Sequence, residues 1–187
     1  MDAFSYLSVL MSVVLGLAIQ QILQGYRAIA LARRRVRLYW PTIAWSVLLL
    51  AMIAQHWWAS FGLAAPREWT FPAFAVILVT AALIYMMAAL VLPDVGADGS
   101  MDLRDHYWRE VPTFFAVGAA AVLSSIVREI ILEGRPPLGF NLVFHIIFLA
   151  MTLTAIAVRR EWLHKLFAGT MVGLFLIYIS LLFARLG

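Results

Sequence analysis

The chain has 187 residues, of which 64% are hydrophobic and only 13% are charged, and its mean hydropathy is +0.92. Soluble domains carry about a quarter charged residues and slightly under half apolar ones, so this composition excludes an ordinary soluble domain. The sequence lacks cysteine, which excludes disulfides, thiolate metal sites and iron–sulfur ligation. The net charge is +4, and the basic residues lie near the ends of the apolar segments, where Lys and Arg determine membrane topology. We therefore do not expect nucleic acid as a partner.

Six apolar segments follow one another along the chain, at about 4–30, 40–63, 70–92, 111–132, 140–158 and 165–185. Each is close to the roughly 20 residues that a helix needs to cross a bilayer, and each is too long and too uniformly apolar for a barrel strand. The start, "MDAFSYLSVL", has no basic n-region, so we expect a retained first span rather than a cleaved signal peptide. The sequence predicts an all-α, polytopic bundle of six transmembrane helices, forming one integral-membrane domain over 1–187.

The basic residues of the connecting loops predict the orientation. The first, third and fifth loops contain Arg33, Arg34, Arg35, Arg37, Arg104, Arg109, Arg159, Arg160 and Lys165, whereas the second and fourth contain only Arg67 and Arg135. Because cytoplasmic loops are enriched in Lys and Arg, we expect the odd loops in the cytoplasm and both termini on the outer, periplasmic side of a bacterial inner membrane.

The first helix carries a polar stripe. When residues are plotted at about 100° each, one face holds Ser5, Ser8, Ser12, Gly16, Gln20, Gln24 and Arg27. Polar groups in contact with lipid are costly, so we expect this face to contact other helices or water. Interhelical packing and the wall of a hydrated pathway both remain open. The sixth helix carries a stripe of small residues, Gly169, Gly173 and Ser180, which suits either packing within the chain or contact in a homo-oligomer.

Several polar residues of four different helices are expected at similar depth in the outer half of the bilayer: Gln55, His56, Arg128, Glu129, His145 and Tyr178. Arg128 and Glu129 are adjacent in "SSIVREIILEG", and neighbouring side chains on a helix diverge. We therefore expect each to find a partner on another helix or in water, with Gln55, His56 and His145 as the candidates. The alternatives are a polar cavity open to the outside, or snorkelling combined with a structural ion pair.

His56 and His145 have three interpretations: interior histidines with satisfied hydrogen bonds, proton-relay or substrate-binding groups near Glu129, or axial ligands of a b-type haem or of a metal. The tract "DLRDHYWRE" in the third loop predicts an interfacial helix with Tyr107 and Trp108 at the membrane edge. No cofactor other than this b-type haem alternative is predicted.

The leading hypothesis for function is a channel or transporter for an ion or small solute, optionally proton-linked, acting as a homo-oligomer. In it, the outer polar cluster and the stripe of the first helix form one path. One alternative is a redox or respiratory accessory subunit that holds b-haem or quinone between the second and fifth helices. Another is a structural or assembly subunit of a larger membrane complex. The sequence has no P-loop, G-x-S-x-G or H-E-x-x-H motif, so we favour a protein that is not an enzyme.

Overall fold

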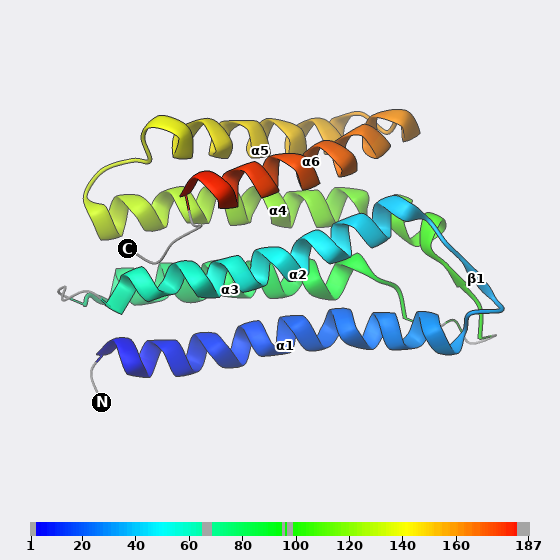
Figure 1. The fold of residues 1–187 in the computed structure, drawn as a ribbon, viewed down its shortest axis with the longest axis horizontal. Helices are drawn as coiled ribbons and strands as arrows, with labels where there is room; N and C mark the ends of the chain where they lie inside the picture. The colour runs from blue at the N-terminus through cyan, green and yellow to red at the C-terminus, as the bar shows by residue number, and fades with distance from the viewer. Residues whose placement is uncertain (1–2, 65–68, 95, 97–98, 183–187) are drawn as a thin grey trace.

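The computed structural model describes residues 3–64, 69–94, 96 and 99–182. Six long helices lie side by side along a common axis (Figure 1). Their bounds are α1 Ala3–Leu31, α2 Trp40–Ser60, α3 Phe71–Val91, α4 Leu103–Glu133, α5 Gly139–Ala157 and α6 Glu161–Leu182. A short 3₁₀ helix, η1 Phe61–Ala64, extends α2, and two short strands, β1 Val36–Arg37 and β2 Met101–Asp102, precede α2 and α4.

The all-α class and the multi-pass membrane character are confirmed. Among the described residues, α1 to α5 are long and apolar enough to cross a membrane. The helix α6 has 22 residues and packs in the same bundle. Each predicted segment corresponds to one helix, and four of the six agree within a few residues at both ends.

Two helices begin earlier than predicted, α4 at Leu103 instead of 111 and α6 at Glu161 instead of 165. The cause in α4 is a helix cap, because the Asp102 carboxylate accepts hydrogen bonds from the backbone N–H of Arg104 and Asp105, both at 2.9 Å. The predicted interfacial helix is therefore the start of α4. With 31 residues, α4 is about 46 Å long, so it projects well beyond a hydrocarbon layer of about 30 Å.

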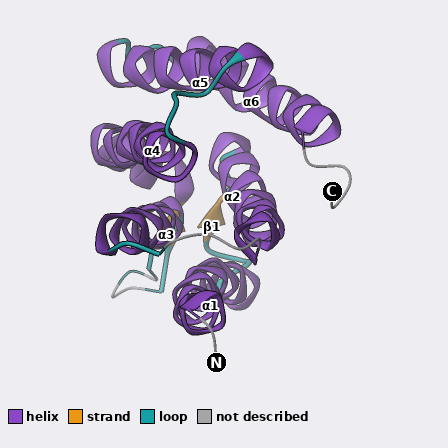
Figure 2. Cartoon of the chain, turned by 90° about the vertical axis from the view of Figure 1, so that its left-hand side faces the viewer, coloured by secondary structure: helices purple, strands orange, loops and turns teal. Residues whose placement is uncertain are grey.

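The helices form a ring of neighbours. Viewed end-on in Figure 2, α1 packs mainly on α2 and α3, while the contacts α3–α4, α4–α5, α5–α6 and α6–α2 complete the circle. The inner face of α1 is an apolar seam of Leu7, Met11, Leu15, Ala18 and Ile22, all buried. Near its end the backbone at Gly25 approaches Leu92 so closely that a Cβ would lie 2.5 Å from the leucine Cδ1, so glycine is required there.

A two-residue parallel ladder joins two loops at one end of the bundle. Val36 pairs with Met101 and Arg37 with Asp102, and the Arg37 guanidinium lies 3.2 Å from the Asp102 carboxylate. This ladder ties the α1–α2 connection to the α3–α4 connection. Sequence reasoning did not predict it, because two residues per strand are too few to show the alternation that marks a strand.

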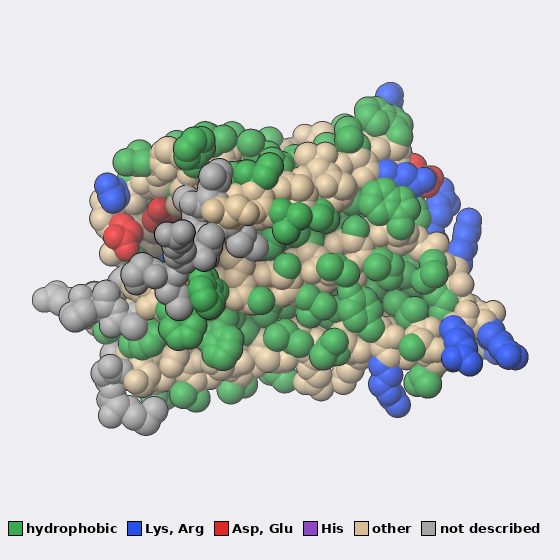
Figure 3. Space-filling model, in the orientation of Figure 1, with side chains coloured by type: hydrophobic (Ala, Val, Ile, Leu, Met, Phe, Trp, Pro, Cys, Tyr) green, Lys and Arg blue, Asp and Glu red, His purple; other side chains and the backbone are tan. Residues whose placement is uncertain are grey.

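Charge is distributed unevenly along the bundle axis. Lys and Arg side chains gather at the end that carries β1 and the starts of α2, α4 and α6 (Figure 3). At the opposite end, where α1 begins and α6 ends, the described basic loop residue is Arg135; Arg67 lies outside the described residues. We call the first end the basic end.

Candidate functional site: an apolar cavity with a polar end

A cavity of about 130 Å³ lies inside the ring, among α2, α3, α4, α5 and α6. Most of its wall is aromatic or aliphatic, including Trp45, Phe114, Phe115, Phe148 and Phe175. No residue of α1 lines it. The cavity therefore belongs to the last five helices, and α1 covers the bundle from one side.

Polar side chains from four helices meet on one part of this wall. Gln55 and His56 come from α2, Ser125 from α4, His145 from α5 and Tyr178 from α6. Four of these five belong to the cluster expected from depth along the helices. The two remaining members of that cluster, Arg128 and Glu129 on α4, do not line the cavity.

Among the described residues, His56 and Arg128 have no hydrogen-bond or ion-pair partner. His56 is 9% exposed, and its imidazole makes no hydrogen bond within the described part of the chain. Arg128 is partly buried and lies within electrostatic range of both His56 and Tyr178. The described residues contain no carboxylate paired with its guanidinium. Polar groups that are shielded from water and lack a partner are costly, so this pair is the feature of the site that calls for a ligand.

Glu129 does find its partner on another helix, as its divergence from Arg128 suggested, but the partner is not one of the expected candidates. The side-chain amide of Asn141 on α5 donates to both carboxylate oxygens of Glu129, at 2.9 and 2.8 Å. Sequence reasoning missed Asn141, although a signal existed: it is the only asparagine in the chain, and the α4–α5 turn brings the first turn of α5 level with the last turns of α4.

The hydrogen bonds of His145 identify its tautomer. A backbone carbonyl can only accept, so Nδ1 carries the proton and donates to the carbonyl of Asn141 at 2.8 Å. Nε2 then accepts from the Ser125 hydroxyl at 3.1 Å. With both ring nitrogens engaged, His145 would have to give up Ser125 in order to ligate a haem iron. The described residues also contain no group of three His, Cys, Asp or Glu suited to a metal ion.

The polar stripe of α1 lies away from the cavity. Gly16, Gln20, Gln24 and Arg27 are exposed on the side of α1 opposite to its apolar seam. The serines at the start of the stripe are partly buried, and the Ser12 hydroxyl donates to the carbonyl of Ser8 at 2.6 Å. Within one chain the stripe therefore does not face other helices, and it does not connect with the outer polar cluster.

The small residues of α6 also face outward. Gly169, Gly173 and Ser180 are exposed, and a Cβ at either glycine would meet nothing within 4 Å. The Ser180 hydroxyl donates to the carbonyl of Leu176 in its own helix, at 2.8 Å.

A second polar cluster, which the sequence did not suggest, lies at the basic end. His164 on α6 is fully buried, donates from Nε2 to the carbonyl of Val158 at 3.0 Å and accepts at Nδ1 from the Tyr107 hydroxyl at 2.9 Å. His106 lies 2.9 Å from the carbonyl of Leu90 through Nε2. Tyr107 and His164 are 57 residues apart in the chain, so no local spacing reveals their contact.

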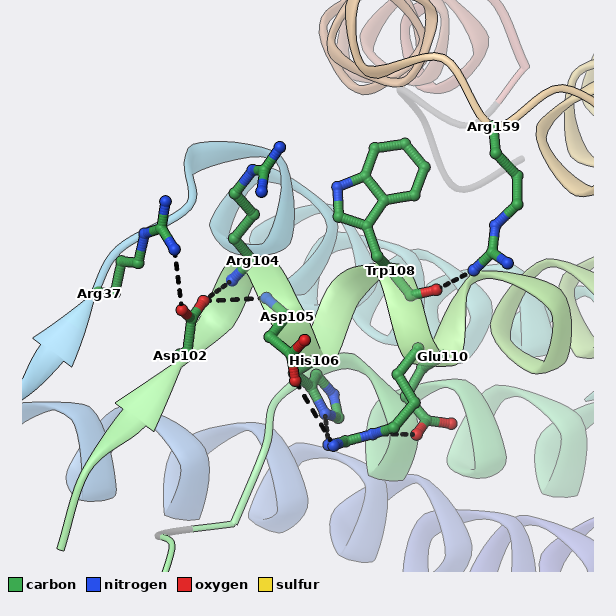
Figure 4. A network of polar contacts seen from close by, with 9 residues as sticks. Arg37, Asp102, Arg104, Asp105, His106, Trp108, Glu110 and Arg159 are labelled. Carbon is green, nitrogen blue, oxygen red and sulfur yellow. Dashed lines mark hydrogen bonds and ion pairs between the residues drawn. The ribbon is translucent and has the colours of Figure 1, made fainter.

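Ion pairs surround this second cluster (Figure 4). The figure shows Arg37 beside Asp102, and Arg159 donating to the carbonyl oxygen of Trp108. Outside this view, Glu161 accepts from Arg104 at 2.7 Å and lies 2.9 Å from the Lys165 ammonium. These two cations lower the pKa of Glu161 to about 2. The polar groups of this second cluster are thus largely satisfied by other described residues of the chain.

The pKa of Tyr39, next to this cluster, is raised to about 12, first by burial and then by the negative charge of Glu161. Its phenol is therefore neutral at physiological pH, and its hydroxyl is buried without a hydrogen-bond partner among the described residues. The ring packs on that of Tyr107 with centroids 5.3 Å apart, which indicates a packing role.

No protein-family model, curated protein or solved structure matches this chain. Its function is therefore inferred from the geometry of the cavity and of the helix faces.

Proposed function

We propose that this multi-pass membrane protein binds a lipid-soluble small molecule with one polar, ring-sized head, of which a quinone is the representative class. The observation that carries the proposal is the cavity itself. It combines a largely aromatic and aliphatic wall with a few polar side chains, among them His56, which has no partner in the described chain. Arg128, within electrostatic range of His56, has none there either. Binding pockets for small molecules share this plan of an apolar body with a few convergent polar groups.

The size of the cavity supports a single-ring ligand. Its volume is about 130 Å³, and apolar cavities of about 150 Å³ accept a benzene ring. A quinone head is one six-membered ring with two carbonyl groups, which matches this space. A porphyrin is several times larger and would need the helices to separate. Among the redox alternatives, the quinone is therefore favoured over b-haem.

The polar groups can donate the hydrogen bonds that the carbonyl oxygens of a quinone head accept. These oxygens only accept hydrogen bonds, and the cavity wall offers donors from the His56 ring and the Gln55 amide. The Arg128 guanidinium lies within electrostatic range of His56 and Tyr178 but does not line the cavity. The ring would lie against Trp45 and the phenylalanines of α4. A transport path receives less support, because the cavity has few polar groups and stops short of the α1 stripe.

Binding is tested by tryptophan fluorescence of the purified protein in nanodiscs, titrated with ubiquinone-1, since quinones quench nearby indoles. Trp45 lines the cavity and is 4% exposed, whereas Trp57 is 48% exposed on the bundle surface. We expect saturable quenching that is lost in Trp45→Phe and kept in the matched control Trp57→Phe.

Non-saturable quenching, equal in both variants, would indicate partition into the lipid only and would contradict the proposal. A parallel titration with decanoate distinguishes two classes of lipid-soluble ligand, quinones and fatty acids. If decanoate displaces ubiquinone-1 at lower concentration than a second quinone does, the site is one for acyl chains and the quinone assignment is wrong.

For topology, we propose six spans in a bacterial-type inner membrane, with the basic end in the cytoplasm and both termini outside. The support is the gathering of Lys and Arg at one end of the bundle. Because the chain has no cysteine, single substitutions can be labelled. In intact cells, a membrane-impermeant maleimide should label Arg135→Cys and spare Arg33→Cys. The reverse pattern would invert the topology.

A further inference from the structure

Two glutamine side chains on α1 face the surroundings of the bundle instead of its core. Gln20 and Gln24 are exposed, and neither makes a hydrogen bond within the described part of the chain. Figure 2 shows that α1 occupies one edge of the bundle, with neighbours only on its inner side. The next residue along the chain from Gln20 behaves differently, because the amide of Gln21 donates inward to the Tyr85 hydroxyl at 3.3 Å.

The depth of Gln20 prevents it from reaching water. The helix α1 has 29 residues, and Gln20 lies about 4.5 Å from its middle, well within a hydrocarbon layer of about 30 Å. Side chains on a helix lean toward its N-terminus, which for Gln20 is away from the nearer, basic end. An amide held at this depth needs a hydrogen-bonding partner from another membrane helix.

On the described surface of the bundle, the amides that could pair with Gln20 and Gln24 are those of the same two residues in a second copy. The chain contains four glutamines and one asparagine. Gln21 is bonded to Tyr85, Gln55 lines the cavity and Asn141 is bonded to Glu129. On the described outer surface of the bundle, the exposed side-chain amides are therefore those of Gln20 and Gln24. An amide both donates and accepts, so two copies of the same face are complementary to one another.

We propose that the polar face of α1 is a homodimer interface, in which Gln20 and Gln24 hydrogen-bond across a two-fold axis to the same face of a second copy. An isologous contact of this kind brings identical residues together at the same depth, and interhelical bonds between amides stabilise membrane helix pairs.

The rest of the α1 face suits close contact. One turn from Gln20, a Cβ at Gly16 would meet nothing within 4 Å, so a partner helix can approach the backbone there. Val9 and Val13 flank the stripe with exposed apolar surface. A crossing centred at Gly16 splays the helix ends, which keeps the two Arg27 side chains apart at the level of the headgroups.

The first experiment is disulfide cross-linking of single-cysteine variants in native membranes, since the chain has no cysteine of its own. Val13→Cys lies on the proposed face and leaves both glutamines intact. Val79→Cys on α3 is the control, because its side chain is similarly exposed, 51% against 55% for Val13. We expect a disulfide-linked dimer for Val13→Cys and mostly monomer for Val79→Cys. Equal cross-linking of both variants would overturn the proposal.

The second experiment measures association in liposomes by energy transfer between labelled protomers, as a function of dilution in lipid. The double variant Gln20→Leu/Gln24→Leu should weaken dimerisation at least about tenfold, because it removes the interhelical hydrogen bonds of both amides. Its thermal unfolding midpoint should stay the same or rise, since leucine suits a lipid-facing position.

A wild-type chain that is monomeric at every dilution would also overturn the proposal, and would point to a helix of another membrane protein on this face. The cavity contains no residue of α1, so the outcome is independent of ligand binding.

Discussion

The two ends of the bundle each bring two buried histidines together, and they use them differently. At the basic end, His106 and His164 lie within hydrogen-bonding distance of backbone carbonyls, and His164 also accepts from Tyr107. At the cavity, His145 is satisfied in the same way, but His56 has no partner in the described chain. A histidine whose hydrogen bonds are complete within the fold has a structural role, whereas one left incomplete beside a cavity is available to a ligand.

The arginines repeat this contrast. Arg104 at the basic end forms an ion pair with Glu161 at 2.7 Å, while Arg128 near the cavity lies next to Glu129, whose carboxylate is taken by Asn141. Arg128 and Glu129 do not form an ion pair with each other in the described structure. Glu129 is bonded by Asn141, whereas Arg128 has no comparable partner among the described residues. Substitutions should therefore affect stability at the basic end and ligand binding at the cavity.

The largest effect is expected for His164→Ala. The change opens a cavity at a fully buried position and leaves the Tyr107 hydroxyl without its acceptor, which together should lower the free energy of unfolding by roughly 3 kcal/mol. Thermal unfolding in detergent measures it. The control is Leu166→Ala, at a position 55% exposed, which should change the midpoint little. Equal losses of stability in both variants would contradict the structural role assigned to His164.

A smaller loss is expected for Asn141→Leu, which leaves the partly buried Glu129 carboxylate without its donor. The cost should be about 2 kcal/mol, the range for a hydrogen bond to a charged group. Asn141→Asp sharpens the test, because it replaces the amide donor by a second carboxylate beside Glu129 and should destabilise more than Asn141→Leu. A variant as stable as wild type would show that Glu129 reaches water instead.

For Asp102→Ala we expect a loss of about 1 kcal/mol, the usual effect of removing a helix cap. The carboxylate caps α4 and also contacts Arg37, so the variant should additionally loosen the two-residue ladder. Hydrogen exchange at Met101 and Asp105 would report both effects. Asp105→Ala, at a side chain 76% exposed, is the matched control and should have little effect.

His56→Leu should change the free energy of unfolding by less than about 1 kcal/mol, because no hydrogen bond within the chain is lost and the apolar wall is extended. The same variant should weaken ubiquinone-1 binding about tenfold, equivalent to roughly 1.4 kcal/mol. A large loss of stability with unchanged binding would place His56 with the structural histidines.

The smallest effect concerns pH at the basic end. The Glu161 pKa falls from 4.5 to about 2 in the folded protein, through its hydrogen bonds to Arg104 and Lys165. Its contribution to stability is therefore present above pH 4.5 and is lost as the pH falls through about 2. The effect is small because the pair is exposed. Unfolding midpoints measured between pH 5 and pH 2 should fall less in Glu161→Gln than in wild type.

Much of the outer cluster could be read from the sequence because depth along a membrane helix is a local property. Counting residues from the helix ends was enough to bring Gln55, His56, His145 and Tyr178 to one level. The same method missed Asn141 and His164, because whether a side chain at a given depth finds an acceptor depends on the rotation and tilt of neighbouring helices. For the α1 stripe, the sequence predicted a face toward other helices or water but not which helix, because the rule that polar groups avoid lipid does not say whether the partner belongs to the same chain.

By itself, the sequence determined that this is a helical membrane protein, where four of its six helices begin and end to within a few residues, and which loops are basic. These properties follow from the length and composition of contiguous segments. Only the tertiary structure decided that α4 reaches back to Leu103, that α1 stands outside the cavity and that His56 and Arg128 have no partner among the residues the structure describes. The reason is physical: satisfaction of a buried polar group is a property of the space between helices, and that space exists only after packing.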